Sequence, residues 1–352
     1  MQTEEDSFDE QWYLQTYPDI RKAVEEGGFQ SGREHFLSFG RNEGRAPHAA
    51  FNSGKAKLVD QDRLVRLLGY ANPFASSDPI ADSPALPASF IGFDLHSHSW
   101  IFDAAQVRLD PDEIRAALQR DCAPIPATSN REGYFGDQHL AFWLHGFKDF
   151  KKLTAIAESY GIRSGSYYDF GGATGRVFRH FYFQSKEWRV SSSDFKIAHV
   201  DWNLANYPSE ILVFQNMYFP FLPIEDRTFD LISAMSVFTH IDETETSWLL
   251  ELRRIMKPGA IAIVTVHNDD TWLNLPLELR SVVETYSPEL AAMPSLPRGR
   301  SVSSWRVDDP YRCNTFHSND YIRTQWSRIF DIKEIRSLAF DAQAAVVLQK
   351  RA

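Results

Sequence analysis

The chain has 352 residues, and its 37 Lys and Arg residues against 47 Asp and Glu residues give a formal net charge of −10. This negative charge argues against nucleic-acid binding as the main function. Apolar residues make up 43 % and charged residues 24 % of the chain, a balance that excludes a largely disordered protein.

Targeting and redox signals favour a cytoplasmic protein. No apolar run approaches the roughly 20 residues that a membrane span requires, and the acidic first ten residues do not form a secretory signal. We therefore expect a cytoplasmic location and no membrane span. Cys122 and Cys313 lie far apart, so neither a disulfide framework nor a zinc site is predicted, and no other metal site is expected.

The first part of the chain, residues 8–50, is rich in aromatic and charged residues. It resembles a short helical unit that occurs as repeats in bacterial proteins, often beside glycosyltransferases. The matching residues are Phe8, Tyr13-Leu14, Pro18-Asp19, His35-Phe36, Gly40 and Glu43-Gly44-Arg45. The resemblance implies a small helical unit that docks or packs, with glycan-assembly enzymes as candidate partners. Residues 51–134 follow, where frequent Pro and Ser predict a linker and a lead-in segment.

From about residue 135 to residue 352, short apolar runs alternate with amphipathic stretches. The strand-like runs are Ser166–Gly171, Trp188–Asp194, Ile211–Asn216, Phe229–Met235, Ala260–Val266, Phe330–Leu338 and Ala344–Leu348, and helix-like segments occupy Arg176–Phe183, Lys196–Leu204 and Asp242–Lys257. The alternation predicts an α/β domain with a doubly wound, mostly parallel sheet. The last two runs are too close in sequence for a parallel crossover, so the final strand is expected to run antiparallel.

The helix at 242–257 carries local start and stop signals. Asp242, with Glu245 three residues later, predicts a capping box at its N-terminus. Pro258-Gly259 after it predicts a turn into the next strand.

A glycine-rich turn follows the first strand of this domain, in the sequence YYDFGGATGR from Tyr167 to Arg176. Small residues let backbone N–H groups approach a ligand closely, and the helix that follows adds a partial positive charge. The second strand ends at Asp194, 19 residues after Gly175, near the spacing at which a carboxylate accepts hydrogen bonds from a ribose. The pattern predicts a nucleoside-type ligand.

The spacing of the glycines distinguishes between nucleoside ligands. Dinucleotide folds use Gly-x-Gly-x-x-Gly to admit a pyrophosphate, which glycines at 171, 172 and 175 cannot form. This weighs against a nicotinamide or nucleotide-sugar oxidoreductase. Asp169 beside the turn would repel a pyrophosphate, yet it suits a ligand with an ammonium group, such as S-adenosyl-L-methionine.

Residues from about 135 to 350 resemble a class I S-adenosylmethionine-dependent methyltransferase. The matching stretches are YYDFGGATGRVFRHF (167–181), LPIEDRTFDLISAMSVFTHIDE (222–243), WLLELRRIMKPGAIAIVTVH (248–267) and FHSNDYIRTQWSRIFDI (316–332). The resemblance implies a Rossmann-like sheet of seven strands that binds S-adenosylmethionine. The cofactor-binding residues that it implies are Asp169, Gly171, Gly172, Ala173 and Gly175 for the methionine moiety, Asp194 for the ribose, and Asn216 and Met217 for the adenine.

Two residues depart from the family pattern. Ala173 stands at the family's middle glycine, and Asn216 replaces the acid often found after the third strand. Both departures leave open a non-catalytic module that still binds the cofactor.

Two histidines are candidate general bases for methyl transfer. His240 follows the fourth strand and His267 the fifth, so both can face the cleft above the sheet. The insertion at 270–315 is either a substrate cover, with Tyr311, Phe316 and His317 as contact candidates, or a surface loop.

Together these features predict methyl transfer from S-adenosylmethionine to a small-molecule or glycan acceptor. A carbohydrate hydroxyl in surface polysaccharide synthesis is favoured by the N-terminal resemblance and by the 14 % aromatic content. The alternative is a non-catalytic cofactor-binding or scaffolding module in a glycan-assembly complex.

Overall fold

The computed structural model describes residues 8–40, 45–48, 86–87, 110–305 and 312–351. The chain divides into two compact units, Met1–Lys55 and Ala56–Ala352. Most of the expected linker lies outside the described residues, as does Tyr311.

The first unit is a small helical assembly, as the sequence predicts. It contains α1 (Glu10–Thr16), α2 (Pro18–Glu25) and α3 (Gly32–His35), followed by a π turn at Phe36–Gly40. Its core is formed by the buried side chains of Tyr13, Ile20 and Phe36. Two helices begin at side-chain caps: Asp9 accepts from the backbone N–H of Trp12, and Ser31 accepts from that of Glu34.

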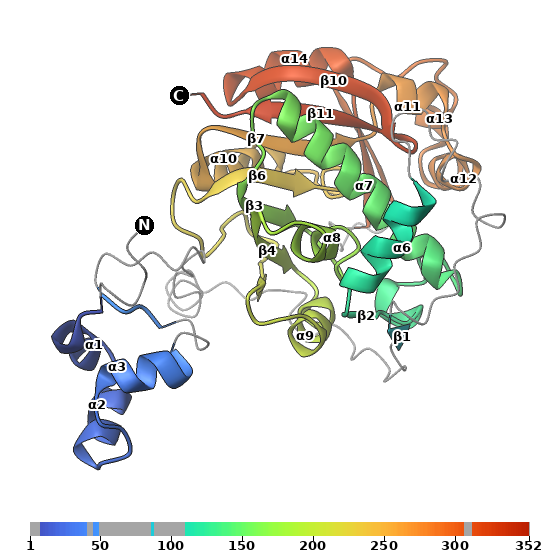
Figure 1. Cartoon of the computed structure of the whole chain (residues 1–352). Coiled ribbons are helices and arrows are strands. Elements are labelled where there is room, and N and C mark those ends of the chain that lie inside the picture. The colour runs from blue at the N-terminus through green and yellow to red at the C-terminus, as the bar shows by residue number, and fades with distance from the viewer. Residues whose placement is uncertain (1–7, 41–44, 49–85, 88–109, 306–311, 352) are drawn as a thin grey trace. The chain divides into compact units, whose positions relative to one another are not determined.

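The second unit is built on a seven-stranded sheet in the order β10-β11-β7-β6-β3-β4-β5. The strands are β3 (Gly165–Phe170), β4 (Trp188–Asp194), β5 (Leu212–Gln215), β6 (Phe229–Ala234), β7 (Met256–Val266), β10 (Asp331–Phe340) and β11 (Gln343–Gln349). Every pairing is parallel except those of β11, which is antiparallel to both β7 and β10. The predicted Rossmann-like methyltransferase fold, with its antiparallel final strand, is confirmed (Figure 1).

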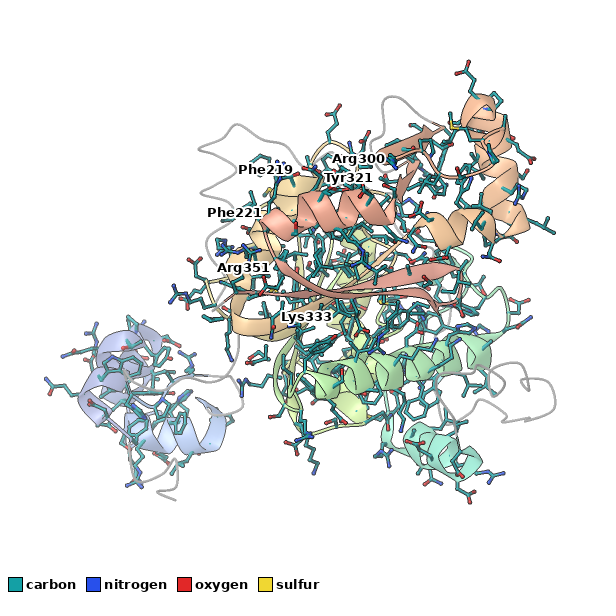
Figure 2. The ribbon with its side chains drawn as sticks, turned by 90° about the horizontal axis from the view of Figure 1, so that it is seen from above. Phe219, Phe221, Arg300, Tyr321, Lys333 and Arg351 are labelled. Carbon is teal, nitrogen blue, oxygen red and sulfur yellow. The ribbon has the colours of Figure 1, made fainter. Side chains whose placement is uncertain are left out.

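Helices cover both faces of this sheet. One core contains side chains of α6 (Pro111–Arg120), α7 (His139–Ser159), α8 (Phe178–Phe183) and α9 (Ile197–Asn206). The other contains side chains of α10 (Glu245–Ile255) and α14 (Asn319–Gln325). The alternation of strand residues assigns them to these cores, since Tyr167 lies in the first and Tyr168 in the second. Figure 2 shows α7 and α14 on opposite faces.

The lead-in segment contributes to the first core. The short strand β1 (Leu86–Pro87) pairs with β2 (Pro124–Ile125), and α6 buries Ile114, Ala117 and Leu118 among the residues of α7 and α8. Part of the stretch that the sequence assigns to a linker and lead-in, 51–134, is therefore packed into the larger unit.

The expected capping box at Asp242 and Glu245 is wrong. The helix α10 begins at Glu245 with Thr244 as its N-cap residue, and no side chain caps it. Asp242 pairs instead with Arg300, Oδ1 to Nη2, at 2.6 Å. The carboxylate of Glu245, 2 % exposed, accepts hydrogen bonds from His317 Nε2, Tyr321 Oη and Trp326 Nε1. Distant polar partners thus override the local capping pattern.

Pro258-Gly259 does not form the expected turn between the helix and the next strand. The strand β7 begins at Met256, before these residues, and its pairing with β6 shifts between Phe229 and Leu231. Pro258 and Gly259 therefore form an irregularity within β7, where Gly259 takes the left-handed backbone (φ 79°) that glycine adopts without strain.

The insertion before β10 forms a small subdomain. It contains α11 (Asp269–Leu273), α12 (Leu277–Tyr286), α13 (Pro288–Ala291), β8 (Arg300–Ser304) and β9 (Cys313–His317). Phe316 packs with Trp272, Val283 and Leu296 in a core of this subdomain. Phe316 and His317 are each 0 % exposed. These two residues are therefore structural side chains; they are neither substrate contacts nor part of a surface loop.

No described helix combines the length and the apolar character needed to cross a membrane.

Candidate functional site

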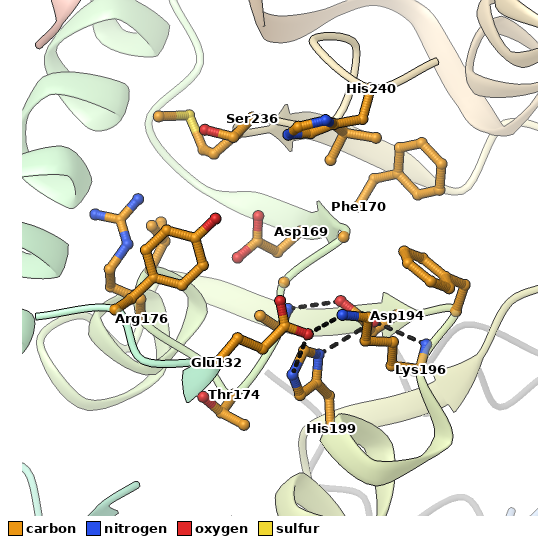
Figure 3. Close-up of a pocket in the computed structure, with 18 of the residues that line it drawn as sticks. Glu132, Asp169, Phe170, Thr174, Arg176, Asp194, Lys196, His199, Ser236 and His240 are labelled. Atoms are coloured by element: carbon orange, nitrogen blue, oxygen red, sulfur yellow. Dashed lines mark hydrogen bonds and ion pairs between the residues drawn. The ribbon is translucent and has the colours of Figure 1, made fainter. Parts of the chain in front are cut away.

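A cavity of about 330 Å³ opens at the carboxyl ends of β3, β4 and β6, where ligands bind in doubly wound sheets. Figure 3 shows Ser236 and His240 on one side of it, Glu132, Asp194, Lys196 and His199 on the other, and Asp169 between them. The cavity collects the loop after β3, the ends of β4 and β6, and the segment before α7. All the predicted cofactor-binding residues except Gly175 line this cavity.

The glycine positions of the loop leave no room for a side chain. A Cβ atom at Gly172 would collide with Ser192 Oγ, and one at Gly175 would collide with the hydroxyl of Tyr207. Gly175 also has a φ of 84°, in the left-handed region. Glycine at these positions therefore lets the loop pack closely against β4 and Tyr207. Gly171, Gly172, Ala173 and Thr174 all line the cavity, whereas Gly175 lies behind it.

Ala173 occupies the family's glycine position in a conformation that suits glycine. Its φ is 45°, which costs an L-residue roughly 1–2 kcal/mol. Two hydrogen bonds hold it there: its N–H donates to Asp194 Oδ2 at 3.0 Å, and its carbonyl accepts from Asn203 Nδ2 at 2.7 Å. The loop thus keeps the backbone of a glycine loop while it carries a methyl group.

Asp169 places a buried carboxylate beside this loop. Its Oδ1 accepts a hydrogen bond from Ser233 Oγ, and the residue is 3 % exposed. Burial raises the pKa of Asp169 to about 6, opposed by the Ser233 hydrogen bond and by the charge of Arg176. The carboxyl group of Asp169 lines the cavity, where it can accept a hydrogen bond.

Asp194, at the end of β4, is the second carboxylate of the site. It accepts from the N–H groups of Ala173 and Lys196, and its Oδ1 lies 3.2 Å from His199 Nδ1. Burial opposes ionisation, but His199 and these hydrogen bonds outweigh it and lower the pKa of Asp194. Asp194 therefore links the glycine loop to the first turn of α9 and stays negatively charged.

Glu132 adds a third carboxylate to this charged cluster in the lining of the cavity. Its carboxylate pairs with Lys196 Nζ and lies 3.4 Å from His199 Nε2. Despite burial, the carboxylates of Asp194 and Glu132 raise the pKa of His199. The sequence reasoning missed Glu132, Lys196 and His199. His199 lies five residues after Asp194, a spacing that could have suggested the pair, whereas nothing local indicates Glu132.

Asn216 and Met217 lie where the family resemblance implies, after β5 and in the wall of the cavity. The amide of Asn216 is already engaged, since its Oδ1 accepts from Ser193 Oγ at 2.9 Å and its Nδ2 donates to the carbonyl of Met217 at 3.0 Å. Both residues are buried. They shape the cavity, with Phe195 and Tyr218 beside them in its lining.

The two candidate bases differ in position. His240 lines the cavity, and its Nδ1 donates to the carbonyl of Cys313 at 2.6 Å. In the neutral ring this hydrogen bond leaves Nε2 unprotonated. Burial lowers the pKa of His240, which favours the neutral ring. His240 is therefore a neutral ring at neutral pH, with its lone pair on Nε2.

His267 is not brought into the cavity lining. It is 6 % exposed, and its ring lies 5.3 Å from that of Phe316, centroid to centroid. Burial and the neighbouring rings of His240 and His317 lower the pKa of His267 to about 3. Its side chain is thus a neutral element of the packing between β7 and the insertion.

Across the described ranges, no group of three or more His, Cys, Asp and Glu side chains is arranged to hold a metal ion.

The chain was compared with curated proteins, solved structures and family models. No curated protein matches the chain. Among solved structures, a methyltransferase from Methanosarcina mazei aligns at 14% sequence identity over 56% of this chain and 97% of its own, with a TM-score of 0.40. A Pyrococcus horikoshii protein aligns at 14% identity over 61% and 93%, with a TM-score of 0.41. The glycopeptide N-methyltransferase MtfA aligns at 14% identity over 56% and 85%, with a TM-score of 0.40.

A family model gives the assignment. Residues 142–330, more than half of the chain, match the model described as a methyltransferase domain. This range begins in α7 and ends just before β10, so it includes the glycine loop, Asp194 and His240. The chain belongs to the methyltransferase-domain family.

Proposed function

We propose that the chain transfers a methyl group from S-adenosylmethionine to an acceptor bound in the same cavity. The observation that carries this proposal is the glycine loop, whose backbone lines the cavity beside the two acidic residues Asp169 and Asp194. The loop backbone and Asp169 would hold the amino-acid tail, whose ammonium group matches the negative charge. Asp194 would hold the ribose, and the walls at Asn216 and Met217 would border the adenine.

When bound, the cofactor supplies an electrophilic methyl group on a sulfonium ion. The residues of the chain orient the two reactants and exclude water, which accounts for much of the rate of a transfer between bound molecules. His240 would accept the proton of the acceptor at Nε2, because its Nδ1 is committed to the carbonyl of Cys313. His267 was the other candidate from the sequence, and its position outside the cavity lining favours His240.

We infer that the acceptor is a small molecule or a glycan, with a carbohydrate hydroxyl preferred. Aromatic side chains of the segment before α7 and of α7 itself, Tyr134, Phe135 and Phe142, line the cavity. Such rings offer flat apolar area against which a sugar ring packs. A role in surface polysaccharide synthesis and a cytoplasmic location belong to the same proposal.

A second candidate is a non-catalytic module that binds the cofactor and tethers glycan enzymes. The departures at Ala173 and Asn216 favour it, since the first places a methyl group in the loop and the second offers an amide that is already hydrogen-bonded. The two functions are distinguished by measuring methyl transfer, which only the enzyme carries out. A chain that binds S-adenosylmethionine, but transfers no label from it to any component of a glycan extract, would be the module.

Replacing Asp194 by Ala tests the cofactor site. Because Asp194 is ionised and joins the glycine loop to α9, we expect S-adenosylmethionine binding to weaken by about 1.5–3 kcal/mol, the loss typical of hydrogen bonds to a charged group. Isothermal titration calorimetry with the cofactor and its demethylated product measures this. Asp201→Ala removes an exposed carboxylate of α9 and should leave the affinity unchanged. Equal affinities of the two folded variants would refute the assignment of Asp194.

For residues 8–50 we propose a docking role toward glycan-assembly enzymes. The unit has its own core, yet Leu37 and Phe39 are 45 % and 53 % exposed, which suits a contact surface. A chain without these residues should keep its affinity for S-adenosylmethionine and sediment with fewer partners or copies. A large fall in melting temperature at unchanged mass would show that the unit only stabilises the larger one.

A further inference from the structure

A second cavity, of about 340 Å³, is lined mainly by basic side chains. It lies among the loop before β6, the end of α10, the start of β7 and the residues after β11. Its lining consists of Asp226, Arg227, Leu250, Arg253, Arg254, Pro258, Lys350 and Arg351. Figure 2 labels Arg351 at the periphery of the larger unit. Five cations around one cavity contrast with the net charge of −10 for the chain.

This basic cavity and the cofactor cavity lie at opposite ends of the sheet. Arg227 precedes β6, whereas Met235 and Ser236 of the cofactor cavity follow it. A strand of six residues spans about 20 Å. A small ligand that fills one cavity therefore does not reach the other, and the basic cavity is not part of the methyl-transfer site.

Two of the five cations are neutralised by carboxylates of their own. Arg254 pairs with both Glu251 and Asp226, at 2.7 Å each. Arg351 pairs with Asp331, also at 2.7 Å. Asp226 is the carboxylate in the lining, and it is therefore engaged by Arg254.

The other three cations keep an unbalanced charge. Within the described part of the chain, no carboxylate pairs with Arg227, Arg253 or Lys350. Lys350 is only 9 % exposed and donates to the carbonyl of Met256 at 2.7 Å, and the Nε of Arg253 is buried without a hydrogen-bond partner. Burial, and then the charges of Arg253 and Arg227, lower the pKa of Lys350. Crowded, partly desolvated cations are costly unless an anion joins them.

The helix dipole accounts for only part of this arrangement. Arg253 and Arg254 lie in the last turn of α10, where cations offset the negative end of the helix. Lys350 and Arg227 come from other elements, after β11 and before β6. Their convergence on the same cavity is not required by α10.

We propose that this cavity binds the phosphoryl group of a small anionic ligand through Arg253, Lys350 and Arg227. A guanidinium matches two phosphate oxygens with its planar fork, and a lysine ammonium adds a compact point charge. The cavity is of the size at which small-ligand sites begin.

The full chain is titrated with inorganic diphosphate by isothermal titration calorimetry at constant ionic strength. Saturable binding is expected. Arg253→Gln and Lys350→Met should each weaken it about 10- to 100-fold, the loss of a charged hydrogen bond. Arg323→Gln removes an exposed charge from α14 and should leave it unchanged. If Lys350→Met does not fold, Arg227→Gln, at an exposed position, replaces it.

Lack of saturable binding would overturn the proposal, and so would an equal loss in the Arg323→Gln control, which would indicate unspecific attraction. Vesicles of phosphatidylcholine with phosphatidic acid then identify the source of the phosphoryl group. Diphosphate binding alone points to a soluble ligand, and vesicle binding that Arg253→Gln also abolishes points to a lipid headgroup. Vesicle binding without diphosphate binding would contradict the site. The affinity for S-adenosylmethionine, measured in the same variants, should not change in any of them.

Discussion

Replacing His240 by Gln is expected to lower the rate of methyl transfer roughly 10²- to 10⁴-fold, the usual contribution of a positioned general base. The cofactor affinity should remain, because the hydrogen bonds of the glycine loop and Asp194 do not involve His240. Glutamine can still donate to the carbonyl of Cys313, which His240 Nδ1 now contacts, but it cannot take up a proton. Single-turnover assays with labelled S-adenosylmethionine, combined with calorimetry, separate the two effects.

The same substitution at His267 distinguishes the two candidate bases. His267 lies outside the cavity lining and packs on Phe316, so His267→Gln should affect stability more than turnover. A loss of turnover confined to His267→Gln would assign the base to His267. Near wild-type turnover in both variants would mean that solvent removes the proton and that catalysis rests on orientation alone.

Replacing Glu245 by Ala is expected to destabilise the larger unit by about 3–5 kcal/mol, because the change leaves buried partners without an acceptor. His317, Tyr321 and Trp326 all donate to this carboxylate. Equilibrium unfolding in urea measures the loss. Tyr321→Phe removes one of the three hydrogen bonds and should cost only about 1 kcal/mol. A similar cost for both variants would show that the carboxylate does not hold the cluster together.

The same carboxylate gives a pH dependence with a definite sign. Burial opposes ionisation, but the hydrogen bonds and charge of its partners outweigh it, so the pKa of Glu245 is lowered from the ordinary 4.5. Its stabilisation is therefore fully present above the ordinary pKa and is lost as the pH falls through the lowered value. Urea unfolding between pH 3 and 6 measures the free energy of unfolding. Its decrease toward low pH should be smaller in Glu245→Ala than in the wild type, because the variant lacks this carboxylate.

Local patterns were sufficient to predict the sheet and the glycine loop. The strands are short apolar runs, and each predicted run contains most of the strand observed there, from β3 to β11. Asp169, Asp194 and Gly172 were predicted from the order of strand, turn and helix and from the family resemblance, and all three line the cavity. All three lie at one end of the sheet, which the parallel topology requires.

Residues fixed by distant partners were not predictable in this way. Glu245 looks like a capping residue from its neighbours, yet it accepts hydrogen bonds from His317 in β9, from Tyr321 in α14 and from Trp326 just after α14. Glu132 joins the site from 62 residues before Asp194. Such contacts depend on which distant segments the tertiary structure brings together. A pattern within a window of a few residues carries no information about that.

The place of β11 in the sheet has a consequence for how the larger unit folds. This strand follows all the others in sequence, yet it pairs with β7 from Ala344↔Val266 to Gln349↔Ile261, between β7 and β10. During synthesis, one edge of β7 therefore stays unpaired until about 80 further residues have been made. An unpaired, apolar edge of this kind can template aggregation. Cotranslational folding of the sheet can proceed from β3 to β6. The pairing of β11 with β7 is delayed until this final strand has left the ribosome.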